Sequence, residues 1–152
     1  YESISEKVNK AKPNTKVTTP ITSAIKALEF LKIKKITVFT PYTDEINQSV
    51  IKYFNDNNFE IVKLSYFDIK SDIDIGKVDK EYLYKILSKL DLSDSDALFV
   101  SCTALPVLTL IDKLEKNLKK PVLSSNQTLI WDTLRKVNYH EKINGFGMLF
   151  NN

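Results

Sequence analysis

The sequence predicts an α/β fold in which helices flank a parallel sheet, as in flavodoxin-like and Rossmann-like domains. Its apolar pattern alternates between short β-branched runs and longer segments with a helical period, which is typical of βαβ units. One short run, Ala97 to Ser101, is apolar on both faces, as a central strand of a parallel sheet is. With 152 residues, 43% of them hydrophobic, the chain has the size and composition of one globular domain.

Four runs are predicted to be strands because each is short and rich in β-branched or aromatic residues. In chain order they are Ile36 to Thr40, Phe59 to Leu64, Ala97 to Ser101, and Pro121 to Ser124. The segments between them are long enough to hold a helix each.

Five amphipathic helices are predicted around these strands. They begin near Thr22 behind Pro20, after Thr43 or Asp44, after Asp79, near Val107, and after Asn126. Each carries an apolar stripe that can cover one face of a sheet. The segment after Val137 is predicted to be an extended tail or an edge strand.

Composition and charge exclude several classes of protein. The net charge is only +3, from 22 basic and 19 acidic residues of interspersed sign, which does not favour a nucleic-acid partner. The longest apolar stretches, such as Pro106 to Ile111, fall far short of the ~20 residues that cross a bilayer, so no membrane partner is expected. With three glycines, the chain cannot build a glycine-rich dinucleotide fingerprint or a phosphate loop.

Cysteine and histidine usage narrows the chemistry further. One cysteine excludes an intrachain disulfide, and one cysteine with one histidine cannot supply a His/Cys metal site. A free thiol in a reducing compartment, and thus a cytoplasmic location, is the simplest interpretation. The chain starts at Tyr1 with no signal-like segment, which suggests a piece of a longer protein.

Chemically useful side chains follow three of the predicted strands. They are Thr40-Pro41-Tyr42, Ser101-Cys102-Thr103 and Ser124-Ser125-Asn126. Ligands of open parallel sheets bind beyond the carboxyl ends of the strands, so these three corners are expected to face one crevice.

Cys102 is the most informative of these residues. A cysteine between a buried strand and a helix lies where free backbone N–H groups and the helix dipole favour a thiolate. The same N–H groups can hold a carboxylate. The alternative is a buried cysteine that acts as a small apolar side chain.

The neighbouring candidates also have structural alternatives. Tyr42, which Pro41 orients, can donate a hydrogen bond to a carboxylate without adding charge, or can simply pack. Ser124 to Asn126 can line the crevice or form the N-cap of the last helix. His140 is predicted to be exposed in the tail, and Trp131 to lie in the core.

Several of these runs together resemble the aspartate/glutamate racemase superfamily, in the branch that contains maleate cis-trans isomerases and arylmalonate decarboxylases. The resemblance covers residues 17 to 137 and rests on ordered motifs. They are Val17-Thr18-Thr19-Pro20, Phe39 to Asn47, Phe99-Val100-Ser101-Cys102-Thr103, and Lys120 to Gln127 with Trp131, Leu134 and Arg135 after them.

The resemblance implies a fold of two similar α/β lobes with the active site between them. This chain is similar to the second lobe. We therefore expect residues 1–17 to lead in from a missing upstream lobe, 18–137 to form the second lobe, and 138–152 to return to the first.

The resemblance also implies roles for particular residues. Cys102 matches a cysteine that exchanges a proton with a substrate carbon, and Tyr42 a tyrosine that hydrogen-bonds a substrate carboxylate. Thr103 matches a position whose N–H, with that of Cys102, holds a carboxylate. Asp72 stands where maleate isomerases have a substrate-binding asparagine, and a carboxylate there would repel a dicarboxylate.

The function this implies is a cofactor-independent isomerase or racemase, similar to maleate isomerase, that acts on a small carboxylate or dicarboxylate through Cys102. Substrate-binding residues would be Tyr42, Thr103, Asp72, Ser125 and Asn126, with no metal. Three alternatives stay open: an arylmalonate-type decarboxylase, a non-catalytic carboxylate-binding module, and a flavodoxin-like domain with a structural cysteine. A homo-oligomer is also kept open.

Overall fold

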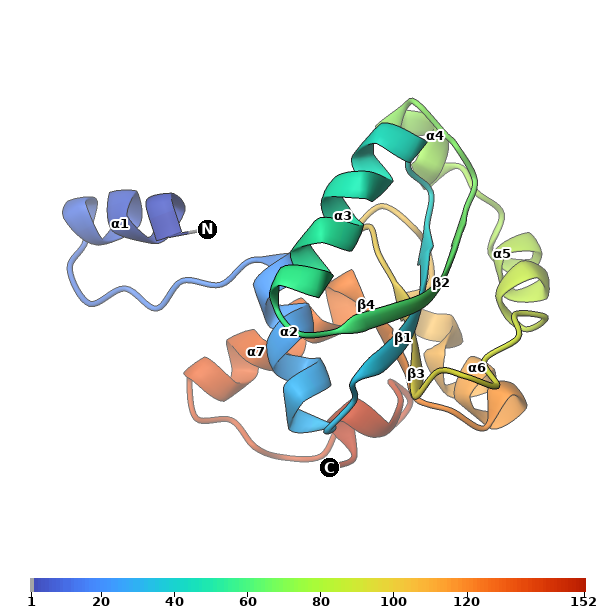
Figure 1. Cartoon of the computed structure of the whole chain (residues 1–152). Coiled ribbons are helices and arrows are strands. Elements are labelled where there is room, and N and C mark those ends of the chain that lie inside the picture. Colours follow the sequence, from blue (N-terminus) through green and yellow to red (C-terminus); the bar gives the residue numbers. More distant parts are fainter. Residues whose placement is uncertain (1) are drawn as a thin grey trace.

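The computed structural model describes residues 2–152 and contains a parallel sheet between two layers of helices (Figure 1). The strands are β1 (Lys35–Thr40), β2 (Glu60–Tyr66), β3 (Ala97–Val100) and β4 (Val122–Ser124). They are ordered β2-β1-β3-β4, and each neighbouring pair is parallel. The predicted fold class and all four predicted strands are confirmed, with ends that differ by one or two residues.

The described part of the chain also contains seven α-helices and two short 3-10 helices. They are α1 (Glu2–Ala11), α2 (Pro20–Phe30), α3 (Asp44–Asp56), α4 (Asp72–Gly76), α5 (Lys80–Leu87), η1 (Leu108–Leu110), α6 (Ile111–Leu118), α7 (Ser125–Lys136) and η2 (Met148–Phe150). No helix among residues 2–152 combines the length and the apolar character needed to span a membrane.

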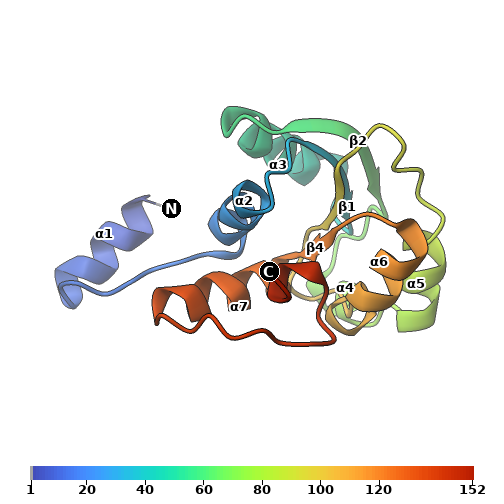
Figure 2. The same cartoon turned by 90° about the horizontal axis from the view of Figure 1, so that it is seen from below.

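The core has two parts, one on each face of the sheet. Figure 2 shows the two layers of helices that cover these faces. Helices α2, α3 and α7 cover one face, where Phe54 packs against Phe99 of β3 and Trp131 belongs to the same cluster. Helices α5 and α6 cover the other face of the sheet, where Leu83 and Leu114 belong to one cluster with apolar side chains of β3 and β4. Because β3 lies between two strands and two layers of helices, all four of its residues are buried, as the apolar run predicted.

Sequence signals located the starts of α3 and α5. Thr43 is the N-cap of α3, and Asp79 accepts the N–H of Tyr82 at the start of α5, as expected. Helix α2 begins at Pro20, earlier than predicted, because Thr19 forms a capping box with Thr22.

Other predictions about helices were incomplete. The helix expected from Val107 becomes α-helical only at Ile111, after the single 3-10 turn η1. Helices α1 and α4 were not predicted at all. Helix α1 lies inside the segment predicted as a lead-in and stands away from the sheet (Figure 1). Tyr1, the first residue of that segment, lies outside the described residues.

A buried carboxylate joins the segment before α2 to α7. The side chain of Asp132 is 6% exposed and lies 3.3 Å from Lys26 Nζ and 3.6 Å from Lys136 Nζ. It also accepts hydrogen bonds from the hydroxyls of Thr18 and Ser23. This network fixes the start of α2, which borders the pocket described below.

Of the two alternatives predicted for the chain after Val137, the edge strand is wrong, and the extended tail does not account for the end of the segment. Its last part is the 3-10 helix η2, whose Leu149 and Phe150 are buried in the core. The edge of β4 cannot accept another strand, because the N–H groups of Val122 and Ser124 donate to the side chains of Glu115 and Gln127.

The tail is held to the helices beside β4 by hydrogen bonds to side chains. Gly147 N–H donates to Asp112 Oδ1 at 2.7 Å, and Met148 N–H donates to Glu115 Oε2 at 2.9 Å. Gln127 Nε2 donates to the carbonyl of Phe146 at 2.6 Å. Gly147 is required at this point, because a Cβ there would lie 2.5 Å from Ile111 Cγ2 and its φ is +84°.

This packing predicts that two glycine substitutions lower the free energy of unfolding by different amounts. Gly147→Ala should lower the free energy of unfolding by about 3 kcal/mol, because it adds a steric clash to a left-handed backbone. Gly145→Ala is the matched control, since Gly145 has a similar φ of +90° but open space around it, and should cost only about 1 kcal/mol. Urea denaturation measures both, and equal costs would contradict the described packing of the tail.

Candidate functional site

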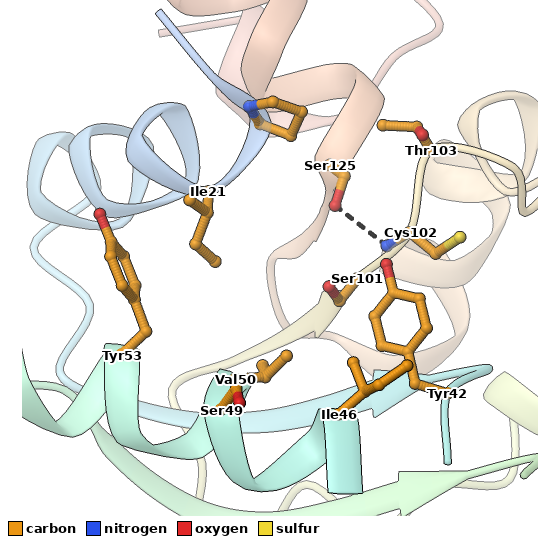
Figure 3. A pocket seen from close by; sticks show the side chains of 11 residues that line it. Ile21, Tyr42, Ile46, Ser49, Val50, Tyr53, Ser101, Cys102, Thr103 and Ser125 are labelled. Carbon is orange, nitrogen blue, oxygen red and sulfur yellow. Dashed lines mark hydrogen bonds between the residues drawn. The ribbon is translucent and has the colours of Figure 1, made fainter. Parts of the chain in front are cut away.

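The three predicted corners do face a common pocket at the carboxyl edge of the sheet. A cavity of about 420 Å³ is bordered by Tyr42 after β1, by Ser101, Cys102 and Thr103 after β3, and by Ser125 after β4 (Figure 3). Strands β1 and β3 are neighbours whose connections leave toward opposite faces of the sheet. This reversal is where open parallel sheets bind ligands.

Cys102 lies at the base of this pocket with an unusual backbone. Its φ is +118°, a conformation that L-residues with a side chain rarely adopt, and the residue is 6% exposed. Its N–H donates to Ser125 Oγ at 3.1 Å, and its Sγ accepts the N–H of Ala104 at 3.4 Å. Strained backbone of this kind concentrates at functional sites, where the surrounding structure must hold it in place.

The helix that begins beside Cys102 is not the one that the sequence indicated. Helix α6 does not begin until Ile111, so Cys102 is not at its N-terminus. Instead, Ser125, the first residue of α7, contacts Cys102 from the end of the neighbouring strand β4. The Cys102 N–H, predicted to bind a carboxylate with that of Thr103, already donates to this serine hydroxyl.

Tyr42 is positioned by a buried pair of polar side chains. Thr40 Oγ1 donates to Asn47 Oδ1 at 2.6 Å and accepts the N–H of Tyr42 at 3.2 Å. Asn47 Nδ2 donates to the carbonyl of Tyr42 at 3.3 Å. Because Thr40 and Asn47 are fully buried, this network fixes the loop from which the phenol reaches the pocket.

The phenol of Tyr42 is held in its neutral, hydrogen-bond-donating form. Burial raises the pKa of Tyr42 well above its usual range, and the adjacent thiol of Cys102 raises it further. The hydroxyl of Ser101 lowers the pKa of Tyr42, whereas the negative charge of Asp72 raises it. Tyr42 can therefore donate a hydrogen bond to an anion without bringing its own charge.

Of the other predicted site residues, some border the pocket and some lie outside it. Thr103 and Ser125 border the pocket. Asn126 is turned away from it, and its Nδ2 donates to the carbonyl of Thr103 at 2.8 Å. Asp72 begins α4, is exposed, and does not border the pocket, although its charge acts on Tyr42. His140 is exposed in the tail and Trp131 is 5% exposed in the core, as predicted.

One side of the pocket was not predicted from the sequence. Helix α3 presents Ile46, Ser49, Val50 and Tyr53 to it, at helical spacing, and the start of α2 adds Pro20 and Ile21. The buried role of Asn47 was also missed. The signal for it was available, because Asn47 precedes Val50 by three residues and Phe54 by seven, which places it on the buried stripe of α3.

The pocket combines neutral hydrogen-bond donors with an apolar wall. None of the described residues that border it is charged. Among residues 2–152, no three His, Cys, Asp or Glu side chains gather in a way that could hold a metal ion. A thiol beside hydroxyl donors can bind a carboxylate and exchange a proton with the adjacent carbon.

Comparison with known proteins identifies related chains. The family model described as arylmalonate decarboxylase matches residues 2–150. The maleate isomerase of Geobacillus stearothermophilus is 29% identical over 126 residues, which are 82% of this chain and 50% of that protein. The arylmalonate decarboxylase of Bordetella bronchiseptica is 26% identical over 136 residues, which are 88% of this chain and 57% of that protein.

A solved structure shares the fold. The maleate cis-trans isomerase of Nocardia farcinica superposes with a TM-score of 0.91 at 22% identity, over 98% of this chain and 61% of that one. The chain thus spans about half the length of the curated relatives it matches.

The raised pKa of Tyr42 predicts a pH dependence of stability. Above about pH 10 the unfolded chain loses the phenolic proton while the folded chain keeps it, so stability falls as pH rises. Tyr42→Phe removes this contribution. Denaturation midpoints measured from pH 8 to 11 should therefore fall less steeply for Tyr42→Phe than for the wild type, and parallel curves would contradict the burial of this phenol.

Proposed function

Because the chain belongs to the arylmalonate decarboxylase family, we propose that it supplies the Cys102 side of a cofactor-independent active site that isomerises a small carboxylate, as maleate isomerases do. The family resemblance recognised in the sequence is confirmed by the family model and by the curated relatives. The assignment of maleate-isomerase-like chemistry to this chain is our proposal, since the chain spans half of those relatives.

One observation carries the proposal. The single thiol of the chain and the phenol of Tyr42 border the same pocket, from the ends of adjacent strands β1 and β3. The phenol keeps its proton, and the thiol lies on a turn that the structure holds in a strained conformation. A thiol with packing as its only role would not need a donor set around it.

The donors around Cys102 suit a carboxylate. The O–H of Tyr42, the O–H of Ser125 and the N–H of Thr103 would hydrogen-bond its two oxygens. Isomerisation, racemisation and decarboxylation next to a carboxylate all add negative charge to that group in the transition state. Fixed donors stabilise this added charge more than they stabilise the ground state, so they increase the rate.

Cys102 would move the proton. As its S–H bond breaks, a C–H bond forms at the carbon beside the carboxylate, and the thiolate remains in the pocket. In cis-trans isomerisation, a second thiolate, which the family resemblance places upstream of this chain, adds to the other carbon of the double bond. After rotation about the new single bond, Cys102 takes a proton back and the second thiolate leaves, so no net redox change occurs.

A second candidate is decarboxylation of a substituted malonate. The apolar wall made by Ile46, Val50 and Ile21 favours a substrate with an apolar substituent. In this reaction the C–C bond to one carboxylate breaks, carbon dioxide leaves, and Cys102 protonates the carbon that keeps the electron pair.

Several assignments made from the sequence stay predictions. They are the upstream lobe, the substrate-binding role of Asp72, self-association into a homo-oligomer, and a cytoplasmic location. A thiol-bearing site between two lobes would be completed by that upstream segment, in which a second cysteine would favour isomerisation over decarboxylation.

The proposal is tested with the protein expressed from its whole open reading frame. Proton NMR in deuterated buffer follows maleate, aspartate, glutamate and phenylmalonate separately. We expect one of them to isomerise, to exchange its α-proton, or to lose carbon dioxide. Cys102→Ser should reduce that rate at least about 100-fold, because a hydroxyl is a poor proton shuttle at neutral pH, while the fold stays intact.

Ser88→Ala, at the half-buried C-cap of α5 and outside the pocket, is the control and should leave the rate unchanged. A Cys102→Ser variant that turns over substrate at the wild-type rate would contradict the proposed role of Cys102. Turnover of none of the substrates by the folded wild type would favour a binding role over catalysis.

A further inference from the structure

The turn that carries Cys102 is held at successive peptide groups by neighbours on both sides. On one side, Ser101 N–H donates to the carbonyl of Phe39 at 2.8 Å, which extends the pairing of β3 with β1. On the other side, Cys102 N–H donates to Ser125 Oγ, and Asn126 Nδ2 donates to the carbonyl of Thr103. Ser125 and Asn126 both belong to the first turn of α7. Figure 3 shows the hydrogen bond between Ser125 and Cys102.

The first turn of α7 is itself firmly anchored. Ser124 and Gln127 form a reciprocal capping box, in which each side chain binds the other residue's backbone N–H. Gln127 is fully buried and also donates to the carbonyl of Phe146 in the tail. A rigid support of this kind can impose an unfavourable backbone conformation on the loop that it contacts.

Resting on the proposed function, we propose that Asn126, with Ser125, is a positioning residue that holds Cys102 in its left-handed conformation and thereby places its thiol at the pocket. Asn126 acts through the carbonyl of Thr103 and does not contact the substrate. This replaces the substrate-binding role that the family resemblance implied for Asn126. Ser125 keeps its place at the pocket, because accepting the Cys102 N–H leaves its own O–H proton free to donate.

The proposal makes a thermodynamic prediction that needs no substrate. At most positions alanine is more favourable than glycine, but at a φ of +118° the alanine Cβ is penalised and glycine is not. Cys102→Gly should therefore have a melting temperature about 3 °C above that of Cys102→Ala. In an Asn126→Ala background the turn can relax, and the advantage of glycine should fall by at least half.

A double-mutant comparison separates positioning from a general structural role. If Asn126 only stabilised α7, Asn126→Ala would lower both melting temperatures equally and leave the difference between glycine and alanine unchanged, which would overturn the proposal. Asn117→Ala is the matched control, since it removes a 3.0 Å side-chain hydrogen bond to the carbonyl of Ser88 on the other side of the sheet. It should not change that difference. Ser125→Ala provides a second background if Asn126→Ala does not fold.

Activity provides the second readout. In the protein from the whole open reading frame, Asn126→Ala should lower kcat at least about 10-fold with little change in KM, because the thiol is misplaced and the carboxylate donors remain. A rise in KM at constant kcat would indicate a direct substrate contact and overturn the positioning role. The melting-temperature comparison does not depend on turnover, so it tests this inference even if the proposed reaction is wrong.

Discussion

The left-handed backbone of Cys102 is the constraint on which the candidate site depends. Strand pairing fixes the chain up to Ser101, and the first turn of α7 fixes the peptide groups that follow. Such a conformation costs about 1–3 kcal/mol, so it persists only where several hydrogen bonds determine it together. The cost has a functional consequence, because an ordinary strand-to-loop turn would point the thiol in another direction.

The rest of the pocket supplies neutral donors around that thiol. Thr40 and Asn47 fix the loop of Tyr42, and burial keeps its phenol protonated. With no charged side chain among the described residues of the pocket wall, an anion would be held by dipoles alone. Hydrogen bonds of this type strengthen as charge builds up on the bound group, which suits proton transfer beside a carboxylate.

The sequence predicted the sheet well and the site in part, for identifiable reasons. Apolar period and strand ends are local properties, so β3 and the corners at Tyr42 and Cys102 could be located from residue patterns. The φ of Cys102 could not, because contacts with α7 impose it from more than 20 residues away. The tail was misassigned because its backbone bonds go to Asp112 and Glu115, side chains that a strand pattern does not reveal.

The central claim is that the Cys102 pocket receives a small carboxylate. The most direct test is the rate at which iodoacetamide alkylates Cys102, the only thiol of the described chain, in the presence of increasing maleate or phenylmalonate. Assignment of the modified residue by mass spectrometry keeps any thiol outside this chain from confusing the result. The account predicts that at least one of these acids slows alkylation saturably. An unchanged rate with both acids, in a folded protein, would contradict it.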